Sequence, residues 1–377
     1  MKICNIVPFF APHFGGVVDR CYHITKELAR RGHAVTLCTS DYQFDRDYAD
    51  TLTDVDIKVS RSFFGRFCIT PGLKQFLDNN ADQFDVFHLM NNYSYVNVVA
   101  SQVCIENKIP FMYSAMGSLP IMSRSFLRKY IFNKSIGKNI VRNASALCAI
   151  TDQEREQYIA YDKSISSSKI VKIPNAIEDP FDSSISGSVI RNRFKIQETS
   201  KVILYVGRLE YVKGVDLLIK AFSKIHHIYP SAVLVIVGPD FGELKKIKAL
   251  INNHKLNEKV FLTGPLYKTD KMSAYAAADL LVVPSRWENM SIVALEAAAW
   301  GKPVVITQTS GFPEIEAEKA GYAVSPTSDA IAEGISKILG NEVGYSMACK
   351  NARDMVLKNY LWDKVGEKME KALLSLI

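Results

Sequence analysis

Short apolar runs rich in β-branched residues alternate with helical patterns along both halves of this chain. In the first half such runs lie at residues 2–7, 34–39, 86–90, 111–114 and 146–150. In the second half they lie at residues 202–206, 233–237, 260–263, 280–283 and 303–307. Apolar strands separated by helices are typical of a parallel sheet that is covered on both faces. Each half therefore predicts one doubly wound α/β domain of the Rossmann-like type.

A change of composition separates the two arrays. Residues 177–200 hold Pro180, several serines around Ser183 and few apolar residues, which predicts a linker. The length of 377 residues suits two domains, which we place at residues 1–178 and 200–359. Ligands of such sheets bind beyond the carboxyl ends of the strands, so we expect a site in a cleft between facing domains.

The composition is that of a globular protein, with 48% hydrophobic and 23% charged residues. No apolar stretch approaches the roughly 20 residues that span a bilayer. Residues 1–10 are apolar after Lys2 but contain Pro8, and they predict a buried first strand rather than a signal peptide. The seven cysteines are odd in number and scattered, which argues against disulfides or structural zinc and favours a cytoplasmic protein.

The net charge of +7 is concentrated in one segment. Seven basic residues lie at positions 108–142, and no Asp or Glu occurs from residue 107 to residue 151. Residues 121–134 mix apolar side chains with the basic residues Arg124, Arg128, Lys129 and Lys134. A basic amphipathic segment suits an anionic membrane surface, so we expect peripheral contact with the inner face of the cell membrane. The alternative is a core-facing helix whose basic side is solvated.

Two cations follow the first strand of the second array. Arg208 and Lys213 lie in the sequence Val-Gly-Arg-Leu-Glu-Tyr-Val-Lys-Gly, which leads from the strand to a helix that begins near Gly214. Cations beside a helix N-terminus suit a diphosphate, because the exposed N–H groups and the helix dipole also favour negative charge. The alternative is a pair of ordinary surface cations.

Two glutamates eight positions apart follow the strand at residues 280–283. Glu288 is predicted in the loop, and Glu296 on the second turn of a helix that runs from about residue 291 to residue 299. An acid among the alanines of such a helix is costly unless it has a polar partner. The alternative is a solvated helix face.

Three further features carry weaker signals. Gly15 and Gly16 follow the first strand and would let a ligand approach the backbone, although no dinucleotide or P-loop fingerprint is present. The carboxylates Asp54 and Asp56 have a spacing that could hold a divalent ion, but they lie where we expect the edge of a hairpin, and we predict no metal. His88 ends a buried strand, where a core histidine is the alternative to a ligand contact.

Together these motifs resemble glycosyltransferase family 4, the retaining transferases that have two facing Rossmann-like domains in the GT-B arrangement. The resemblance covers essentially the whole chain. It rests on Gly15-Gly16, residues 31–33, residues 174–177, Gly207-Arg208, Lys213-Gly214, the two glutamates, residues 309–314 and the final helix that holds Trp362. The family implies that this last helix, at about residues 360–377, packs back on the first domain, which would bind the acceptor.

The resemblance also implies roles for single residues. Arg208 and Lys213 would contact the donor diphosphate, Glu288 a hydroxyl of the donor sugar and Glu296 the ribose, with Arg208, Lys213 and Glu288 as the catalytic set. The donor site would further include Gly15, Gly16, Pro265, Leu266, Asn289, Met290 and Ser291, and the acceptor or sugar pocket His88, Met116 and Gly117. Fixed cations and N–H donors would stabilise the leaving nucleotide without a metal, and no protein nucleophile is required.

The implied reaction moves a hexose from a UDP or GDP sugar to a saccharide acceptor. The acceptor would be lipid-linked, as in the synthesis of O-antigen, capsule or exopolysaccharide. We expect no cofactor and no nucleic-acid partner. Two alternatives are a nucleotide-sugar epimerase of the same architecture, for which we find no acid–base pair, and a non-catalytic protein that binds nucleotide sugars.

The chain departs from the family pattern in two places. Asn289 and Ser291 stand where the family often has glycine, although Asn tolerates a positive φ. Met116 stands where the family often has His or Arg near the donor sugar. A thioether offers no hydrogen-bond donor, which favours a 6-deoxy sugar; the alternative is that Met116 only packs against its neighbours.

Overall fold

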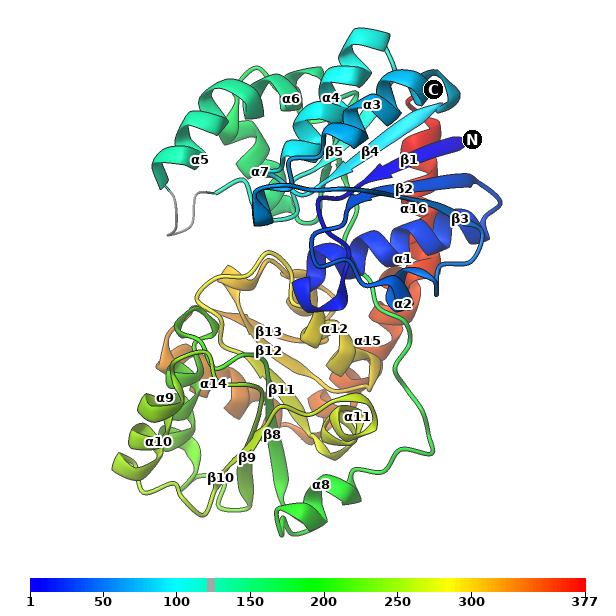
Figure 1. Cartoon of the computed structure of the whole chain (residues 1–377). Helices are drawn as coiled ribbons and strands as arrows, with labels where there is room; N and C mark the ends of the chain where they lie inside the picture. The colour runs from blue at the N-terminus through cyan, green and yellow to red at the C-terminus, as the bar shows by residue number, and fades with distance from the viewer. Residues whose placement is uncertain (121–125) are drawn as a thin grey trace. The chain divides into compact units, whose positions relative to one another are not determined.

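The structure is a computed structural model, and it describes residues 1–120 and 126–377 (Figure 1). The chain divides into two compact units. The first unit comprises Met1–Asn175 together with Trp362–Ile377, and the second comprises Ala176–Leu361. No helix among the described residues is both long and apolar enough to cross a membrane.

The first unit contains a parallel sheet of seven strands with helices on both faces. In spatial order the strands are β3 (Val55–Ser60), β2 (Ala34–Ser40), β1 (Lys2–Ile6), β4 (Val86–Met90), β5 (Phe111–Ser114), β6 (Ala146–Ala149) and β7 (Ile170–Lys172). Its helices are α1 (Gly16–Arg30), α2 (Arg46–Ala49), α3 (Pro71–Asn80), α4 (Tyr95–Asn107), α5 (Phe126–Phe132), α6 (Lys138–Asn143), α7 (Asp152–Tyr161) and α16 (Trp362–Leu374).

The second unit contains a parallel sheet of six strands. In spatial order these are β10 (Val260–Gly264), β9 (Ala232–Val237), β8 (Lys201–Val206), β11 (Leu280–Val283), β12 (Val304–Thr307) and β13 (Gly321–Val324). Its helices are α8 (Ser188–Arg193), α9 (Val215–Ile225), α10 (Leu244–Asn253), α11 (Lys268–Ala277), α12 (Ile292–Ala299), α13 (Glu314–Ala317), α14 (Ser328–Leu339) and α15 (Glu342–Asn359).

The prediction of two doubly wound α/β domains is confirmed, and each expected strand is present within one residue of its predicted ends. The expected hairpin edge at Asp54 is wrong, because β3 pairs in parallel with β2. The expected linker at residues 177–200 contains α8, which is fixed to the second unit: Arg191 donates a hydrogen bond of 3.0 Å to the carbonyl of Ala277. All seven cysteines are free thiols.

The last helix, α16, packs on α1 in the first unit (Figure 1). The Trp362 ring stacks on His23 at 4.8 Å. Arg31 and His33 contact the Glu370 carboxylate at 3.0 and 2.7 Å. The Arg-Gly-His segment at residues 31–33 therefore anchors the C-terminal helix in this structure.

Candidate functional site

The strand order of the second sheet reverses between β8 and β11, which are neighbours. In open parallel sheets the loops that follow two such strands diverge to opposite faces and leave a crevice at the carboxyl edge. The loop after β8 carries Arg208 and Lys213, and the loop after β11 carries Glu288. Both motifs singled out in the sequence thus meet at the switch point of this sheet.

The two loops are in direct backbone contact. The N–H of Arg286 donates to the carbonyl of Val212 at 2.8 Å. Gly214 has φ +69°, and a Cβ there would overlap the carbonyl oxygen of Pro284. A positive φ and this close approach both require glycine at position 214. Gly214 also forms the N-terminal boundary of α9.

An ion pair between Lys213 and Glu288 joins the two loops across 75 positions of sequence. The two side chains are only 21% and 12% exposed. The same carboxylate accepts a hydrogen bond from Ser285 Oγ at 3.1 Å. The Glu288 N–H donates to the carbonyl of Thr309 at 3.0 Å, which ties this loop to the segment after β12.

Arg208 is more exposed than Lys213. Its guanidinium lies 3.2 Å from Glu210, at a side-chain exposure of 50%, and 5.0 Å from the centroid of the Phe241 ring. The Tyr205 hydroxyl donates to the Arg208 carbonyl at 2.8 Å, which fixes the backbone. The side chain can therefore turn toward a ligand while its backbone stays in place.

Glu296 has the polar partners that its apolar helix requires. One carboxylate oxygen lies 2.6 Å from Lys271 Nζ, and the other accepts a hydrogen bond of 2.6 Å from the Tyr275 hydroxyl. Burial, together with the neighbouring Glu296, raises the pKa of Tyr275 well above its usual value, so the phenol stays a donor. Glu296 is 15% exposed, which argues against a solvated helix face.

The sequence did not identify Lys271 and Tyr275 as site residues. Both lie on α11, four positions apart, and so share one face of that helix. That spacing was the available signal, but nothing in the sequence pointed to Glu296 as the partner. The loop that enters α11 holds Pro265, which is exposed, and Leu266, which is buried.

The start of α12 provides an unsatisfied hydroxyl. Ser291 precedes the helix and is 2% exposed, and among the described residues its Oγ has no hydrogen-bond partner. Met290 beside it is buried, and a Cβ on Gly311 would overlap the carbonyl of Asn289. Close contact with Gly311 therefore fixes the backbone of this loop. The N-terminus of α12 favours negative charge beside it.

In the first unit, the glycine pair lies at the corresponding switch point, after β1, whose neighbours are β2 and β4. Gly15 has φ +77° and precedes α1, and both glycines are exposed with open space where a Cβ would stand. Met116 also has a positive φ, of 55°, and its partly buried side chain packs against the hydrophobic cluster around Phe9 and Phe10. The N–H of Gly117 is held by the buried carboxylate of Glu154 at 2.5 Å.

His88 has no exposed surface among the described residues. It is fully buried in β4, and its Nε2 lies 2.7 Å from Ser114 Oγ. Burial, together with the nearby guanidinium of Arg20, lowers the pKa of His88 to about 3. We therefore correct its assignment to an acceptor pocket: a ring without exposed atoms belongs to the core.

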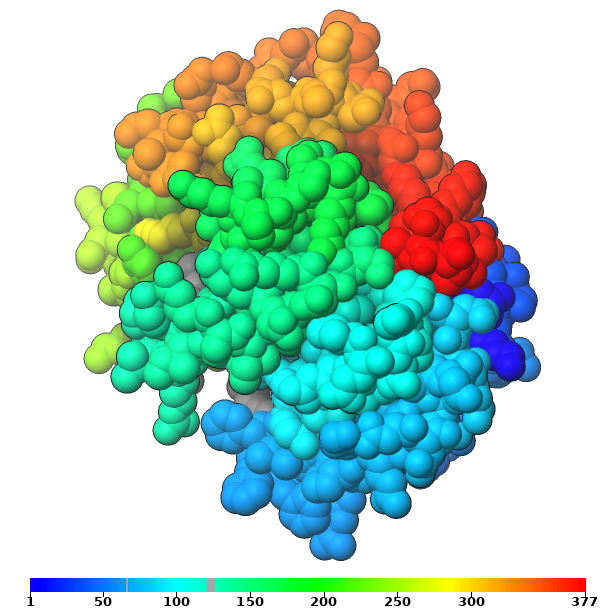
Figure 2. Space-filling model, turned by 90° about the horizontal axis from the view of Figure 1, so that it is seen from above, coloured from blue at the N-terminus to red at the C-terminus, as the bar shows by residue number. Residues whose placement is uncertain are grey.

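The described part of the basic segment after β5 exposes several of its apolar side chains. In α5, Phe126, Leu127 and Ile131 are 62%, 69% and 57% exposed. Lys129 lies over the Tyr93 ring, and Lys134 over the Tyr130 ring. The alternative of a core-facing helix is therefore wrong for α5, and Figure 2 shows this sea-green region at the surface. Arg124 lies outside the described residues.

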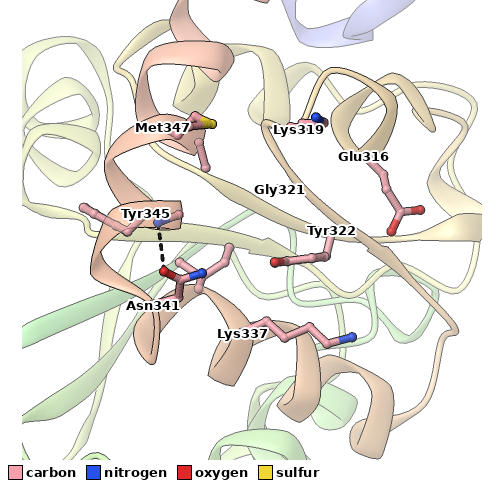
Figure 3. Close-up of a pocket in the computed structure, with 11 residues that line it drawn as sticks. Glu316, Lys319, Gly321, Tyr322, Lys337, Asn341, Tyr345 and Met347 are labelled. Carbon is pink, nitrogen blue, oxygen red and sulfur yellow. Dashed lines mark hydrogen bonds between the residues drawn. The ribbon is translucent and has the colours of Figure 1, made fainter.

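Two further features, the carboxylates Asp54 and Asp56 and the cavity shown in Figure 3, contribute no residue to the site at the switch point of the second sheet. Asp56 pairs with Lys58 at 2.9 Å, and the described residues contain no group of three His, Cys, Asp or Glu side chains that could hold an ion. A cavity of about 240 Å³ is lined by Lys319, Tyr322, Lys337 and Asn341, among others (Figure 3). It lies at the start of β13, the opposite edge of the sheet from Glu288.

Comparison with known proteins agrees with this arrangement. The family model described as Glycosyltransferase Family 4 matches residues 14–179, and that described as Glycosyl transferases group 1 matches residues 188–355. An uncharacterized glycosyltransferase of Methanocaldococcus jannaschii is 28% identical over 395 residues, which span 98% of this chain and 96% of that protein. The lipopolysaccharide 1,2-N-acetylglucosaminetransferase of Salmonella typhimurium is 29% identical over 194 residues, 49% of this chain and 51% of the other.

Among solved structures, Anabaena HepE in complex with UDP is similar over 100% of both chains, with a TM-score of 0.80 and 20% identity. That likeness shows a common fold. The two family models together span most of both units, and the motifs on which the resemblance rested lie within them or in α16. The chain is a group 1 glycosyltransferase of family 4 with the GT-B fold.

Proposed function

We propose that this protein is a retaining transferase that moves a hexose from a UDP or GDP sugar to a saccharide acceptor without a metal ion. The observation that carries the proposal is the meeting of Arg208, Lys213 and Glu288 at the switch point of the second sheet. The structure of HepE with UDP and the transferase activity named for the Salmonella relative support a nucleotide-sugar donor.

The ion pair suggests how a donor would bind. Lys213 is held by a carboxylate, and a diphosphate can take the place of that carboxylate because both are anions with oxygen acceptors. Glu288 then becomes free to accept a hydrogen bond from a sugar hydroxyl. The Ser291 hydroxyl, which has no hydrogen-bond partner among the described residues, and the N–H groups at the start of α12 supply further donors.

Glu296 suits the ribose. Lys271 and Tyr275 each occupy one site on its oxygens, and a carboxylate offers about four. The remaining sites can accept hydrogen bonds from two ribose hydroxyls. As the bond to the sugar breaks, negative charge grows on the leaving phosphate, where Arg208 and Lys213 stabilise it.

The acceptor is proposed to be lipid-linked, in surface polysaccharide synthesis. The exposed apolar residues of α5 beside Arg128 and Lys129 support contact with the anionic inner face of the cell membrane, and so a cytoplasmic protein with peripheral attachment. Replacing Arg128, Lys129 and Lys134 with Ser is expected to release the protein from anionic vesicles.

The test is nucleotide release from UDP and GDP sugars, measured with and without acceptor in excess chelator. Arg208→Ala and Lys213→Ala should each lower transfer by about 10²-fold, the scale for losing one fixed charge-stabilising donor. Lys224→Ala, which removes an exposed cation of α9 paired with Asp329, is the control. Full activity of both site variants contradicts the proposal; conversion of the donor without an acceptor favours an epimerase, and binding without turnover favours a non-catalytic protein.

A further inference from the structure

The loop that follows β5 holds Met116 in an unfavourable backbone conformation. Met116 has φ +55°, and the next residue, Gly117, has φ +76°. This left-handed region suits glycine, whereas a residue with a Cβ clashes there with its own backbone. A residue other than glycine stays in this region only where its surroundings impose it. The conformation of Met116 must therefore be fixed by the contacts around it.

Two side chains of α7 provide such contacts. The Tyr158 hydroxyl accepts a hydrogen bond of 2.8 Å from the N–H of Ala115, and the Glu154 carboxylate accepts one of 2.5 Å from the N–H of Gly117. Glu154 and Tyr158 lie four positions apart, so they share one face of the helix, and both are fully buried. These two side chains thus hold the backbone on both sides of Met116.

Glu154 also connects this loop to the neighbouring strand of the sheet. Its second carboxylate oxygen accepts a hydrogen bond of 2.7 Å from the N–H of Ile150, just after β6, which pairs with β5. Helix α7 follows β6 directly (Figure 1), and the Thr151 hydroxyl caps it by accepting from the N–H of Glu154 at 3.1 Å. Each oxygen of this carboxylate therefore serves as the acceptor for the end of a different strand.

The number of acceptors explains why a carboxylate is needed at this position. A glutamine side chain has nearly the same shape, but one of its two terminal groups is an NH2 donor. In place of Glu154 it would set that donor against a backbone N–H, and a buried donor without an acceptor is costly. Either Gly117 or Ile150 would then lose its partner.

We propose that Glu154 is a positioning residue for sugar transfer, which acts through the N–H of Gly117 to hold Met116 where it meets the donor sugar. The proposal rests on the proposed function, with Met116 beside the sugar and with Arg208 and Lys213 on the diphosphate. Without this anchor the loop relaxes and the sugar is placed less precisely, whereas binding of the nucleotide alone is unchanged.

The test compares Glu154→Gln with Glu156→Gln, which makes the same chemical change at an exposed position of α7. Two donors that share a nucleotide and differ only at the sixth carbon of the sugar give a ratio of kcat/KM values. In Glu154→Gln we expect kcat to fall by about tenfold, because transfer depends on orientation, and the donor ratio to move toward one by about threefold or more. The Kd for the free nucleoside diphosphate should stay within about twofold of the wild type. Glu156→Gln should match the wild type in all three measurements.

The donor ratio separates positioning from stability. A variant that is merely less stable contains less active enzyme, which lowers the rates with both donors equally and leaves their ratio unchanged. Tyr158→Phe removes only the hydroxyl that holds Ala115, so it should shift the ratio in the same direction as Glu154→Gln. Thermal unfolding shows which variants are folded.

A folded Glu154→Gln that keeps the wild-type donor ratio overturns the inference and leaves the proposed function standing. If Glu154→Gln does not fold, an unchanged ratio in Tyr158→Phe overturns the inference in the same way. A wild type that uses both donors equally also contradicts it. If the wild type transfers sugar from neither donor and binds neither UDP nor GDP, the proposed function fails and the inference fails with it.

Discussion

Lys213 and Glu288 are two charges that are mostly hidden from solvent and satisfied by each other. Removing one partner of such a pair leaves an uncompensated charge, which costs more than the pair itself contributes. A site of this kind stays ordered without ligand, and a donor diphosphate can enter by exchanging one anion for another. At Glu296 the partners Lys271 and Tyr275 likewise satisfy the two carboxylate oxygens and fix their orientation.

His88 makes the stability of the protein depend on pH. The unfolded ring titrates near pH 6.5 and the folded ring near 3, so the unfolded state binds the extra proton between these values. The free energy of unfolding should therefore fall as the pH is lowered from about 6.5 toward 3, by about 2 kcal/mol at pH 5. Urea unfolding at pH 7 and pH 5 measures this change in the free energy of unfolding. His88→Gln should remove most of this pH dependence, whereas substitution of the exposed His254 by Gln should leave it unchanged. If the free energy of unfolding depends equally on pH in both variants, His88 is not its source.

The Met116 side chain carries a thioether and no group that donates a hydrogen bond. We therefore propose that the sugar of the donor substrate is a 6-deoxy sugar. A buried hydroxyl without a partner costs about 1–3 kcal/mol, so the 6-hydroxy parent on the same nucleotide should be used less well. Competition between the two donors measures the ratio, and Met116→His should shift it toward the parent. A wild type that prefers the parent by about tenfold, which corresponds to roughly 1.4 kcal/mol, rules this donor out.

At the scale of elements, the site depends on the fit of three loops rather than on one motif. Gly214 and Gly311 both have positive φ and both lie against backbone carbonyls of the loop after β11. The two glycines allow the loops after β8 and β12 to press against the loop that carries Glu288. Their backbones set the position of the charged side chains.

Gly214→Ala should therefore disturb the site without removing any functional group. The left-handed conformation costs roughly 1–2 kcal/mol for a residue with a Cβ, and the overlap with Pro284 adds to it. We expect a lower free energy of unfolding and a lower kcat/KM. Gly72→Ala, where a Cβ would meet open space, is the matched control. Unchanged unfolding and activity in Gly214→Ala would show that the loops are not coupled in this way.

The sequence predicted buried elements better than partly exposed ones. β4 and β11 are wholly buried, and their apolar runs predicted both strands with their ends. β3 is an edge strand of alternating polarity, Val-Asp-Ile-Lys-Val-Ser, a pattern that a hairpin shares, so only long-range pairing distinguishes the two. The sequence did not predict α8, because the serines that precede it are typical of a linker. The position of this segment is fixed by contacts with α11, which no local pattern shows.

In the candidate site, too, local sequence predicted some features, whereas others depend on tertiary contacts. Strand ends and glycines predicted where Arg208, Lys213 and Glu288 lie, because parallel strands deliver their loops to one edge. The partners of Glu296 come from another helix, so only tertiary structure could identify them. His88 was assigned by its position at a strand end, but burial of the whole of β4 placed it in the core.

At the scale of the molecule, the chain leaves the second unit after Leu361 and completes the first unit with α16. Leu373 of α16 is fully buried and the adjacent Leu374 is 48% exposed. Leu373→Ala should lower the free energy of unfolding of the first unit by about 2–5 kcal/mol, because it leaves a cavity. Leu374→Ala should change it by less than about 0.5 kcal/mol. Calorimetric unfolding of both variants tests whether α16 is part of that core, and equal small effects would contradict it.

We propose that the switch point of the second unit binds a nucleoside diphosphate through fixed cations. Isothermal titration of UDP, GDP and their nucleosides in excess chelator tests this binding. We predict that one diphosphate binds at least tenfold more tightly than its nucleoside, roughly 1.4 kcal/mol, and that Lys213→Ala removes most of this difference. Equal binding of diphosphate and nucleoside, or tight binding that appears only with magnesium or manganese, would contradict the claim.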